Sequence, residues 1–314
     1  MKTYNTYLLY ILIILASIFF LYTQMKFKQK NIEEGFQQDK PFLLKQNQDI
    51  YDPFYAEIYD TVSYPQVMCS YIANKIVEHL NPSPKYSTML CVGSGTGALL
   101  KTLHDNHIDN IYGIDKSEAM VNISKEKYPK LPVKLGDVLD SMNYERSTFT
   151  HIFCLNHTYY EIEDKSLFFR NCYYWLKPNS FLILHLVDST KYDPLGIKAS
   201  PHNVGLLTKY SKKTVKHHKT DFPGFSYSND FKVSGSEDDD EDRPSACVVT
   251  QKETFVDKTS ANIRENERTL RIEPVNSVLR LAIEQGFIVH GKFLLEESPV
   301  NDPHQYIYIL ERSH

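Results

Sequence analysis

The sequence predicts an α/β fold in which a parallel sheet is covered by helices on both faces, and three observations lead to this prediction. Short apolar segments alternate with helical patterns from about residue 50 to residue 190. Several of these segments end in glycine or in an acidic residue, as strands do at the ligand-binding edge of an open parallel sheet. Finally, they are apolar at nearly every position, which is typical of strands buried on both faces.

The expected elements follow in order along the chain. The expected strands are residues 88–92, 110–114, 132–135, 149–155 and 181–187. The expected helices are residues 51–62, 65–80, 117–127 and 165–176, with a further helix beginning near residue 99. Near the end of the sequence, a helix over 275–286 and strands over 287–293 and 305–310 restore the α/β pattern.

Residues 200–275 interrupt this alternation and predict an inserted region. They are polar and include an acidic run at 237–242, which we interpret as a solvated loop. The stretches SACVVTQKETFV and ERTLRIEP within them alternate between apolar and polar residues, which predicts antiparallel strands. The region is a candidate lid over a substrate site.

The N-terminal segment predicts a membrane anchor. Residues 7–22 are apolar and uncharged, and as a helix they would span roughly 24 Å. We therefore expect a transmembrane helix within residues 1–25, with a cleavable signal peptide as the alternative. Lys26, Lys28 and Lys30 follow the run and only Lys2 precedes it, so a single-pass protein with a cytosolic catalytic domain is expected. Residues 26–49 would be a tether, and 50–314 the folded domain.

Composition excludes several other classes of protein. The net charge of -4 provides no general attraction for nucleic acid, so no nucleic-acid partner is expected. The five cysteines are odd in number and never spaced as C-x-x-C, which argues against a disulfide framework and a zinc site. No metal is expected.

Glycines and acidic residues follow the expected strands. The first strand leads into Gly93-Ser94-Gly95-Thr96-Gly97, where glycine permits a tight turn and close backbone approach to a ligand. The helix that follows directs its N–H groups at this turn and favours an anionic group. Asp115 ends the second strand, where a carboxylate can accept hydrogen bonds from ribose hydroxyls.

The third and fourth strands continue this arrangement. After the third strand, Asp137 can accept a hydrogen bond from an adenine amino group while the backbone of Val138 faces the ring. Asn156 ends the fourth strand. Because the carboxyl ends of parallel strands meet at one edge of a sheet, all these residues are expected to surround one ligand.

Five stretches together resemble the class I S-adenosylmethionine-dependent methyltransferases of the small-molecule type. They are TMLCVGSGTGALL, NIYGIDKSEAMV, VKLGDVLD, FTHIFCLN and FFRNCYYWLKPNSFLILHLVD. The resemblance covers residues 50–190 well and the last thirty residues weakly. It implies a Rossmann-like, seven-stranded sheet with an antiparallel final strand, and S-adenosylmethionine as the cofactor.

The resemblance also assigns roles to individual residues. The implied contacts are Gly93, Ser94, Gly95 and Gly97 with the methionyl part, Asp115 with the ribose, Asp137 and Val138 with the adenine, Asn156 with the sulfonium end, and Tyr55 and Tyr59 with the cofactor from the N-terminal side. The expected reaction is methyl transfer to an N, O or S atom of a small-molecule, lipid or protein acceptor. His157, Tyr160 and His185 are candidate bases if the acceptor must lose a proton.

Two alternatives remain open at this point. Gly93, Gly95 and Ala98 also fit G-x-G-x-x-A, so an NAD(P)-dependent oxidoreductase is possible, although the additional Asp137 favours a methyltransferase. A non-catalytic, methyltransferase-like binding module is the other. A DNA adenine methyltransferase is disfavoured because the residues after Asn156 lack a proline pair.

Overall fold

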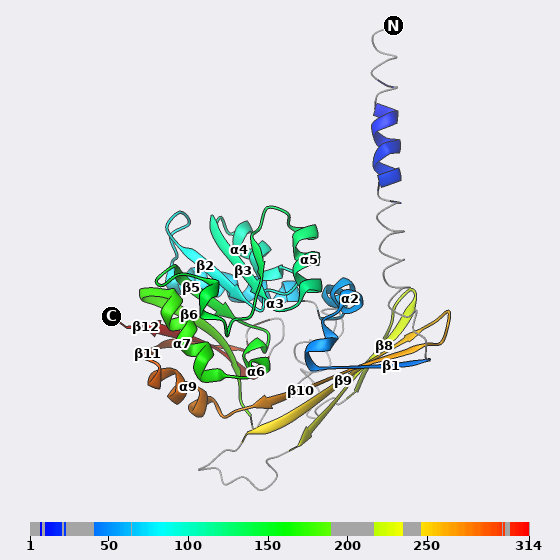
Figure 1. Cartoon of the computed structure of the whole chain (residues 1–314). Coiled ribbons are helices and arrows are strands. Elements are labelled where there is room, and N and C mark those ends of the chain that lie inside the picture. The colour runs from blue at the N-terminus through cyan, green and yellow to red at the C-terminus, as the bar shows by residue number, and fades with distance from the viewer. Residues whose placement is uncertain are drawn as a thin grey trace.

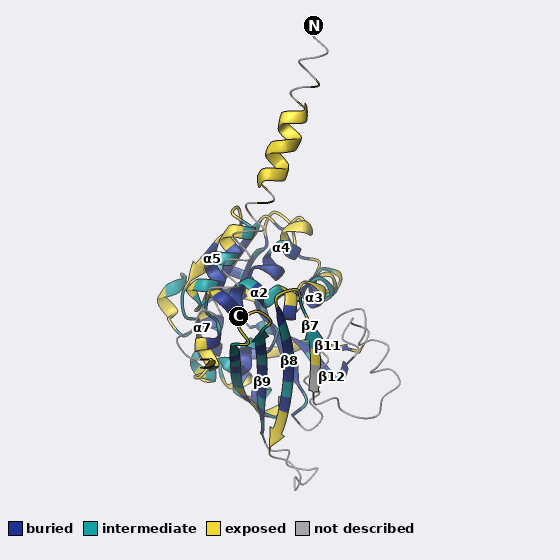
Figure 2. Ribbon diagram, turned by 90° about the vertical axis from the view of Figure 1, so that its right-hand side faces the viewer, coloured by how far each residue is buried: buried dark blue, intermediate teal, exposed yellow. Residues whose placement is uncertain are grey.

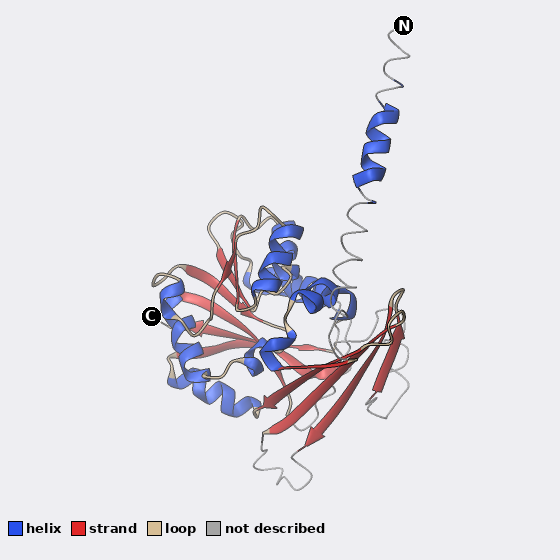
Figure 3. Cartoon of the chain, turned by 45° about the vertical axis from the view of Figure 1, so that its right-hand side comes forward, coloured by secondary structure: helices blue, strands red, loops and turns tan. Residues whose placement is uncertain are grey.

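The computed structural model describes residues 7, 10–20, 22, 41–63, 65–189, 217–234, 246–296, 298 and 302–313. These residues form two sheets, one of seven strands and one of five. Figures 1 and 3 show the two sheets as separate layers, with most helices packed against the larger one. The acidic run at 237–242 lies outside the described residues.

The larger sheet has the predicted topology. Its strands are β2 (Thr88–Val92), β3 (Asn110–Asp115), β4 (Val133–Leu135), β5 (Phe149–Cys154), β6 (Leu176–Val187), β11 (Phe287–Leu295) and β12 (Asp302–Arg312). Their order is β11-β12-β6-β5-β2-β3-β4. Strands β2 to β6 pair in parallel, whereas β12 is antiparallel to both of its neighbours. The expectation of seven strands with an antiparallel final strand is confirmed.

Helices cover both faces of this sheet. They are α2 (Pro53–Ser63), α3 (Pro65–Leu80), α4 (Ala98–Asp105), α5 (Glu118–Lys127), α6 (Thr158–Glu161), α7 (Lys165–Trp175) and α9 (Val275–Glu284), with short 3-10 turns at Asn47–Ile50 and Ser141–Asn143. On β2, Met89 and Cys91 pack in the cluster of α3 and α4, while Leu90 and Val92 pack in the cluster of α7 and α9. Successive strand residues point to opposite faces, so a strand covered on both faces must be apolar throughout.

The smaller sheet contains the strands expected within residues 200–275. Its strands are β1 (Phe42–Gln46), β7 (His217–Asp221), β8 (Phe225–Ser234), β9 (Cys247–Asp257) and β10 (Ile263–Ile272), in the order β1-β10-β9-β8-β7. All pairs are antiparallel except β1 with β10. Buried and less buried residues alternate along β8 and β9, whose ribbons face the viewer in Figure 2.

Strand β1 is a difference from the predicted tether. We expected residues 26–49 to be a polar connection, but residues 42–46 pair with residues 263–267 and residues 47–50 form a 3-10 turn. The five residues FLLKQ contain only three apolar positions, so their pattern alone is weak. They become a strand because β10 offers an edge to pair with.

Helix α2 joins the two sheets. Its residues Phe54 and Ile58 pack in a cluster with Met120 of α5 and with Phe255 of the smaller sheet. In addition, Arg264 of β10 is 1% exposed and binds the Asp52 carboxylate through both terminal nitrogens, at 2.8 and 3.0 Å. Loss of this contact would leave the buried guanidinium of Arg264 without its charged partner, which is costly, so the smaller sheet is fixed to the start of α2.

The N-terminal segment is described only in part. Residues 10–20 are helical and their large apolar side chains are exposed, as the yellow helix in Figure 2 shows. No helix among the described residues is both long enough and apolar enough to span a membrane. Most of the remaining positions of the expected anchor, 1–6, 8, 9, 21 and 23–25, lie outside the described part of the chain.

Candidate active site

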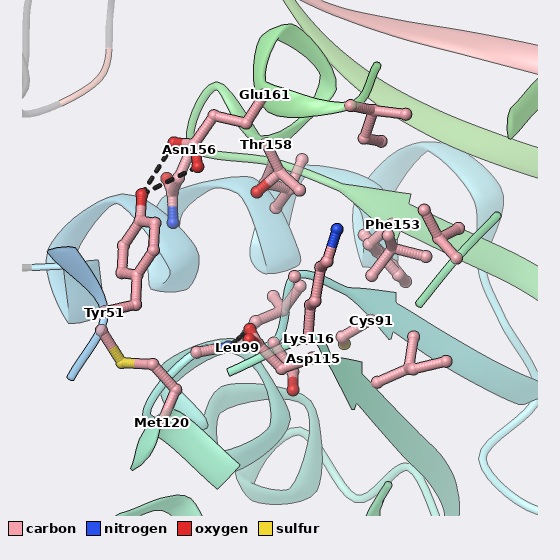
Figure 4. A pocket seen from close by; sticks show the side chains of 18 of the residues that line it. Tyr51, Cys91, Leu99, Asp115, Lys116, Met120, Phe153, Asn156, Thr158 and Glu161 are labelled. Atoms are coloured by element: carbon pink, nitrogen blue, oxygen red, sulfur yellow. Dashed lines mark hydrogen bonds between the residues drawn. The ribbon is translucent and has the colours of Figure 1, made fainter. Parts of the chain in front are cut away.

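A cavity lies at the carboxyl edge of the larger sheet, where β2, β3, β4 and β5 end (Figure 4). Eight of the predicted cofactor residues line it. They are Tyr59, Gly93, Ser94, Gly95, Asp115, Asp137, Val138 and Asn156. The fold therefore brings together residues that are up to about one hundred positions apart in the sequence, as the strand-end argument predicted.

The glycines of the turn after β2 have different surroundings: Gly95 borders the cavity, and Gly97 packs against protein. Gly95 adopts a left-handed φ of +54°, and a Cβ added there would meet no described atom within 4 Å, so its backbone borders open space. Gly97 has a φ of +90°, but its added Cβ would lie 2.5 Å from Oγ of Ser124. Gly97 is thus needed for packing against α5 and lies outside the cavity lining, contrary to the implied contact with the cofactor.

Asp115 is oriented by the backbone on both sides. Its Oδ2 accepts a hydrogen bond from the N–H of Gly95 at 2.7 Å, and its Oδ1 accepts one from the N–H of Ser117 at 2.9 Å. Burial raises the pKa of Asp115, and these two hydrogen bonds counteract the rise in part. Because a carboxylate has about four acceptor positions, Asp115 can still receive the hydroxyls of a ribose.

The turn after β4 is held in a similar way. Oδ1 of Asp137 accepts from the N–H of Leu139 at 2.9 Å, and its Oδ2 lies 3.1 Å from Nζ of Lys116. Val138 is buried, and its carbonyl accepts from Nδ2 of Asn171 at 2.9 Å. The turn thus presents a carboxylate beside apolar side chains, which suits the adenine contact implied for Asp137 and Val138.

The end of β5 has an unusual backbone. Asn156 and His157 are consecutive non-glycine residues with φ values of +52° and +67°. This conformation is uncommon at non-glycine residues, although asparagine and histidine adopt it more readily than most, and it recurs at active sites. Asn156 lines the cavity, and its Nδ2 donates to Sγ of Cys69 at 3.8 Å.

Three residues that the sequence did not suggest form a polar group at the far side of the cavity, and we call them the Glu161 cluster. They are Tyr51, Glu161 and Arg268. The Tyr51 hydroxyl lies 2.8 and 2.9 Å from the two oxygens of Glu161, and Nη1 of Arg268 donates to Oε1 of Glu161 at 2.7 Å. Figure 4 shows Tyr51, Asn156 and Glu161 on one side of the cavity, with Asp115 on the other.

The protonation states of the cluster follow from its surroundings. Burial and then the charge of Glu161 raise the pKa of Tyr51 well above its ordinary value, so its hydroxyl stays protonated and donates. Burial acts to lower the pKa of Arg268, but the negative charges of the neighbouring acidic residues Glu161 and Glu253 act to raise it, and the guanidinium stays charged. Tyr51 is therefore a donor and not a base.

Tyr55 and the three candidate bases lie outside the cavity lining. The Tyr55 hydroxyl donates to the buried carboxylate of Glu253 at 2.7 Å, toward the smaller sheet. The Tyr160 hydroxyl accepts from the N–H of Val187 at 2.9 Å. The ring of His157 stacks on that of His185 at 5.0 Å.

The side chain of His185 is enclosed by protein groups. Its Nε2 pairs with Oε1 of Gln305 at 2.9 Å, and the side chain is fully buried. Burial lowers the pKa of His185 to about 4, which keeps the ring neutral. The structure thus places His157, Tyr160 and His185 in the packing around the ends of β5 and β6, outside the cavity lining.

Comparisons with known proteins give the chain its family context. Residues 90–184 match the family model described as a methyltransferase domain. No curated protein matched the chain. A solved S-adenosylmethionine-dependent methyltransferase from Clostridium acetobutylicum shares the fold with a TM-score of 0.58 and 16% identity, over 83% of this chain and 98% of that one.

Two further solved structures share the fold. An amino pentose methyltransferase from Micromonospora echinaspora, solved with S-adenosylmethionine, has a TM-score of 0.55 and 15% identity, over 82% of this chain and 97% of that one. A sugar N-methyltransferase from Streptoalloteichus has the same TM-score and identity, over 79% and 87%.

The cavity residues suit the same cofactor. The backbone of Gly95, which borders open space, and the oriented carboxylate of Asp115 are groups that a nucleoside with a methionyl tail would contact. The sequence match, the topology and these residues agree. Residues 90–184 therefore carry a methyltransferase domain, in a chain that shares the fold of S-adenosylmethionine-dependent methyltransferases.

Proposed function

We propose that this methyltransferase acts on a small polar molecule that binds between the carboxyl edge of the larger sheet and the smaller sheet. The observation that carries this proposal is the Glu161 cluster. It lines the same cavity as Asp115 and Asn156, but Tyr51 and Arg268 come from outside residues 90–184. Acceptor sites are commonly built from elements added to a shared core.

Different residues of the cavity would have different roles in the reaction. Gly93, Ser94, Gly95 and Asp115 would hold the cofactor, with Asp137 and Val138 at its adenine. Once bound, the cofactor supplies a methyl group attached to a positively charged sulfur. The chain contributes orientation of the acceptor and exclusion of water, which are the main sources of rate in a direct transfer. Tyr59 and Asn156 also line the cavity and would lie beside the group that is transferred.

Two observations support a small polar acceptor. Solved structures with this fold include an amino pentose methyltransferase and a sugar N-methyltransferase. The smaller sheet is fixed to α2 through Arg264 and Asp52, and Arg268 of the same sheet lines the cavity. An acceptor would have to fit beside this fixed side chain, which favours a ligand such as a sugar over a protein surface.

Labelling would test the acceptor class. The protein is incubated with S-adenosylmethionine carrying a labelled methyl group and a whole cell extract, and label is followed in polar small molecules, lipids and proteins. We expect the label among polar small molecules. Label confined to lipid or protein contradicts the proposal. Titration with S-adenosylhomocysteine and with NADPH in parallel tests the oxidoreductase and the non-catalytic alternatives.

We also propose that the N-terminal apolar segment attaches the protein to a membrane, with the catalytic domain in the cytosol. The run of apolar residues at 7–22 and the lysines that follow it support this proposal. The full chain should stay with membranes after alkaline extraction, and a chain lacking residues 7–22 should not. Equal release of both would contradict anchoring, and glycosylation at Asn122 would contradict the cytosolic orientation.

A further inference from the structure

The cavity carries more acidic than basic side chains. Its acidic and basic lining residues are Asp115, Lys116, Asp137, Glu161, Glu163 and Arg268. Both cations are already paired, Lys116 with Asp137 at 3.1 Å and Arg268 with Glu161 at 2.7 Å. The remaining charge is negative, and a partly enclosed cavity of one sign concentrates ligands of the opposite sign.

Arg268 is directed toward protein groups. Its Nη1 donates to Oε1 of Glu161 and to the Tyr51 hydroxyl, the latter at 3.0 Å, while Nη2 donates to Oε1 of Gln251 at 2.6 Å. An anionic ligand would have to displace Glu161 to reach this guanidinium. The cluster is therefore poorly arranged for a carboxylate or a phosphate.

Glu161 retains room for another donor. It accepts from Tyr51 and Arg268, and its side chain remains 16% exposed, at the cavity. A carboxylate offers about four acceptor positions, and bonds between charged partners are stronger than neutral ones. Since Tyr51 and Arg268 fix the orientation of this carboxylate, it can hold an incoming cation in one place.

We infer that the acceptor presents an amine to this site and that Glu161 binds it in its ammonium form. The Glu161 carboxylate then accepts the proton that the ammonium must lose before its nitrogen can take a methyl group. This inference rests on the proposed function, because it names the class of small molecule that is methylated. Glu161 then determines specificity: it distinguishes an amine from a hydroxyl at the same position of an otherwise identical acceptor. The faces of Tyr51 and Tyr59, both at the cavity, add a favourable surface for a cation.

Paired probes test this inference without knowledge of the natural acceptor. The chain is saturated with S-adenosylhomocysteine and titrated calorimetrically with glucosamine and with glucose, which differ in one amine. We expect glucosamine to bind at least about tenfold more tightly at a pH where its amine is protonated. The preference should disappear when the pH is raised until that amine is neutral.

Variants then show which side chain causes the preference for glucosamine over glucose. Glu161→Gln should remove it and Glu161→Asp should retain part of it. Glu163→Gln should have a much smaller effect, because Glu163 is an exposed acid of the same cavity outside the Glu161 cluster. Equal loss in Glu163→Gln and Glu161→Gln would overturn the inference, since it would mean a general field and not a contact. Equal binding of the two sugars by the wild-type chain, or binding of neither, would also overturn it.

The outcome is separable from that of the proposed function. If S-adenosylhomocysteine binds and the sugars are not distinguished, the amine assignment fails while the methyltransferase activity stands. If S-adenosylhomocysteine does not bind to a folded chain, the proposed function itself fails. Thermal unfolding of each variant shows that the comparison is made on folded protein.

Discussion

Replacement of Asp115 by asparagine should weaken cofactor binding strongly and leave the fold intact. The carboxylate is held by the N–H groups of Gly95 and Ser117, so it is already in place before a ligand arrives. The substituted amide would keep one acceptor oxygen but lose the negative charge. A hydrogen bond to a charged group contributes about 1.5–3 kcal/mol. We therefore expect a loss of about 2–3 kcal/mol in binding, or roughly 30- to 160-fold in Kd.

The effect on stability should be smaller. The amide side chain in Asp115→Asn can satisfy only one of the two backbone donors, which costs about 1–2 kcal/mol, but removal of a buried charge offsets part of this cost. Calorimetric titration with S-adenosylhomocysteine gives the Kd, and thermal unfolding gives the stability. Asp105→Asn is the matched control, because this exposed acid of α4 contacts Lys101 at the surface. An unchanged Kd in folded Asp115→Asn would refute the assignment of the ribose to Asp115.

Three further predictions follow from single side chains. The folded-state pKa of Asp115 is raised, so the contribution of Asp115 to the free energy of unfolding should become more favourable as pH falls through that pKa. Cofactor affinity should fall over the same pH range, because the protonated group loses its charge. Unfolding and cofactor titration of the wild type across acidic pH should therefore show opposite trends, and Asp115→Asn should lack both. Tyr55→Phe should destabilise the fold by about 1–3 kcal/mol in denaturant titration, because Glu253 loses a buried donor, while the Kd of the cofactor stays the same. Gly97→Ala should lower the thermal midpoint, because its Cβ would collide with Ser124, and an unchanged midpoint would show that the turn can relax.

The sequence was most informative where a strand is buried on both faces. Residues 88–92 and 149–155 carry polar residues only near their beginnings, so their assignment needed no knowledge of their neighbours. Strand β1 is the opposite case. Its residues, FLLKQ, take their conformation from β10, whose position some 220 residues later in the chain could not be inferred from local pattern.

In the candidate site, too, some residues could be predicted from local sequence and others could not. Asp115 and Asp137 could be predicted because each directly follows a strand, and parallel strands end at one edge. Arg268 lies in the middle of β10, and nothing in its surroundings in the sequence marks it. Its role depends on how the smaller sheet is placed against α6, which only the tertiary structure provides.

Three tyrosines before the larger sheet show why the sequence suggested Tyr55 for the cavity, one helical turn away from Tyr51, which lines it. Tyr51, Tyr55 and Tyr59 are spaced by four residues, so they read as one face of a helix. However, the helix begins at Pro53, which leaves Tyr51 on the preceding turn. Its hydroxyl therefore reaches the cavity, while Tyr55, on the helix, faces the smaller sheet. The proline was visible in the sequence and marks this boundary.

Strand β1 also decides how far the N-terminal part of the chain can be shortened for solution work. Its pairing with β10 runs from Phe42 to Gln46, and the N–H of Ile263 donates to the carbonyl of Pro41 at 2.9 Å. A chain cut at residue 50 would leave the backbone of β10 open to pairing with other molecules, a common cause of aggregation. A chain that starts just before Pro41 keeps this edge covered, so the catalytic unit begins there.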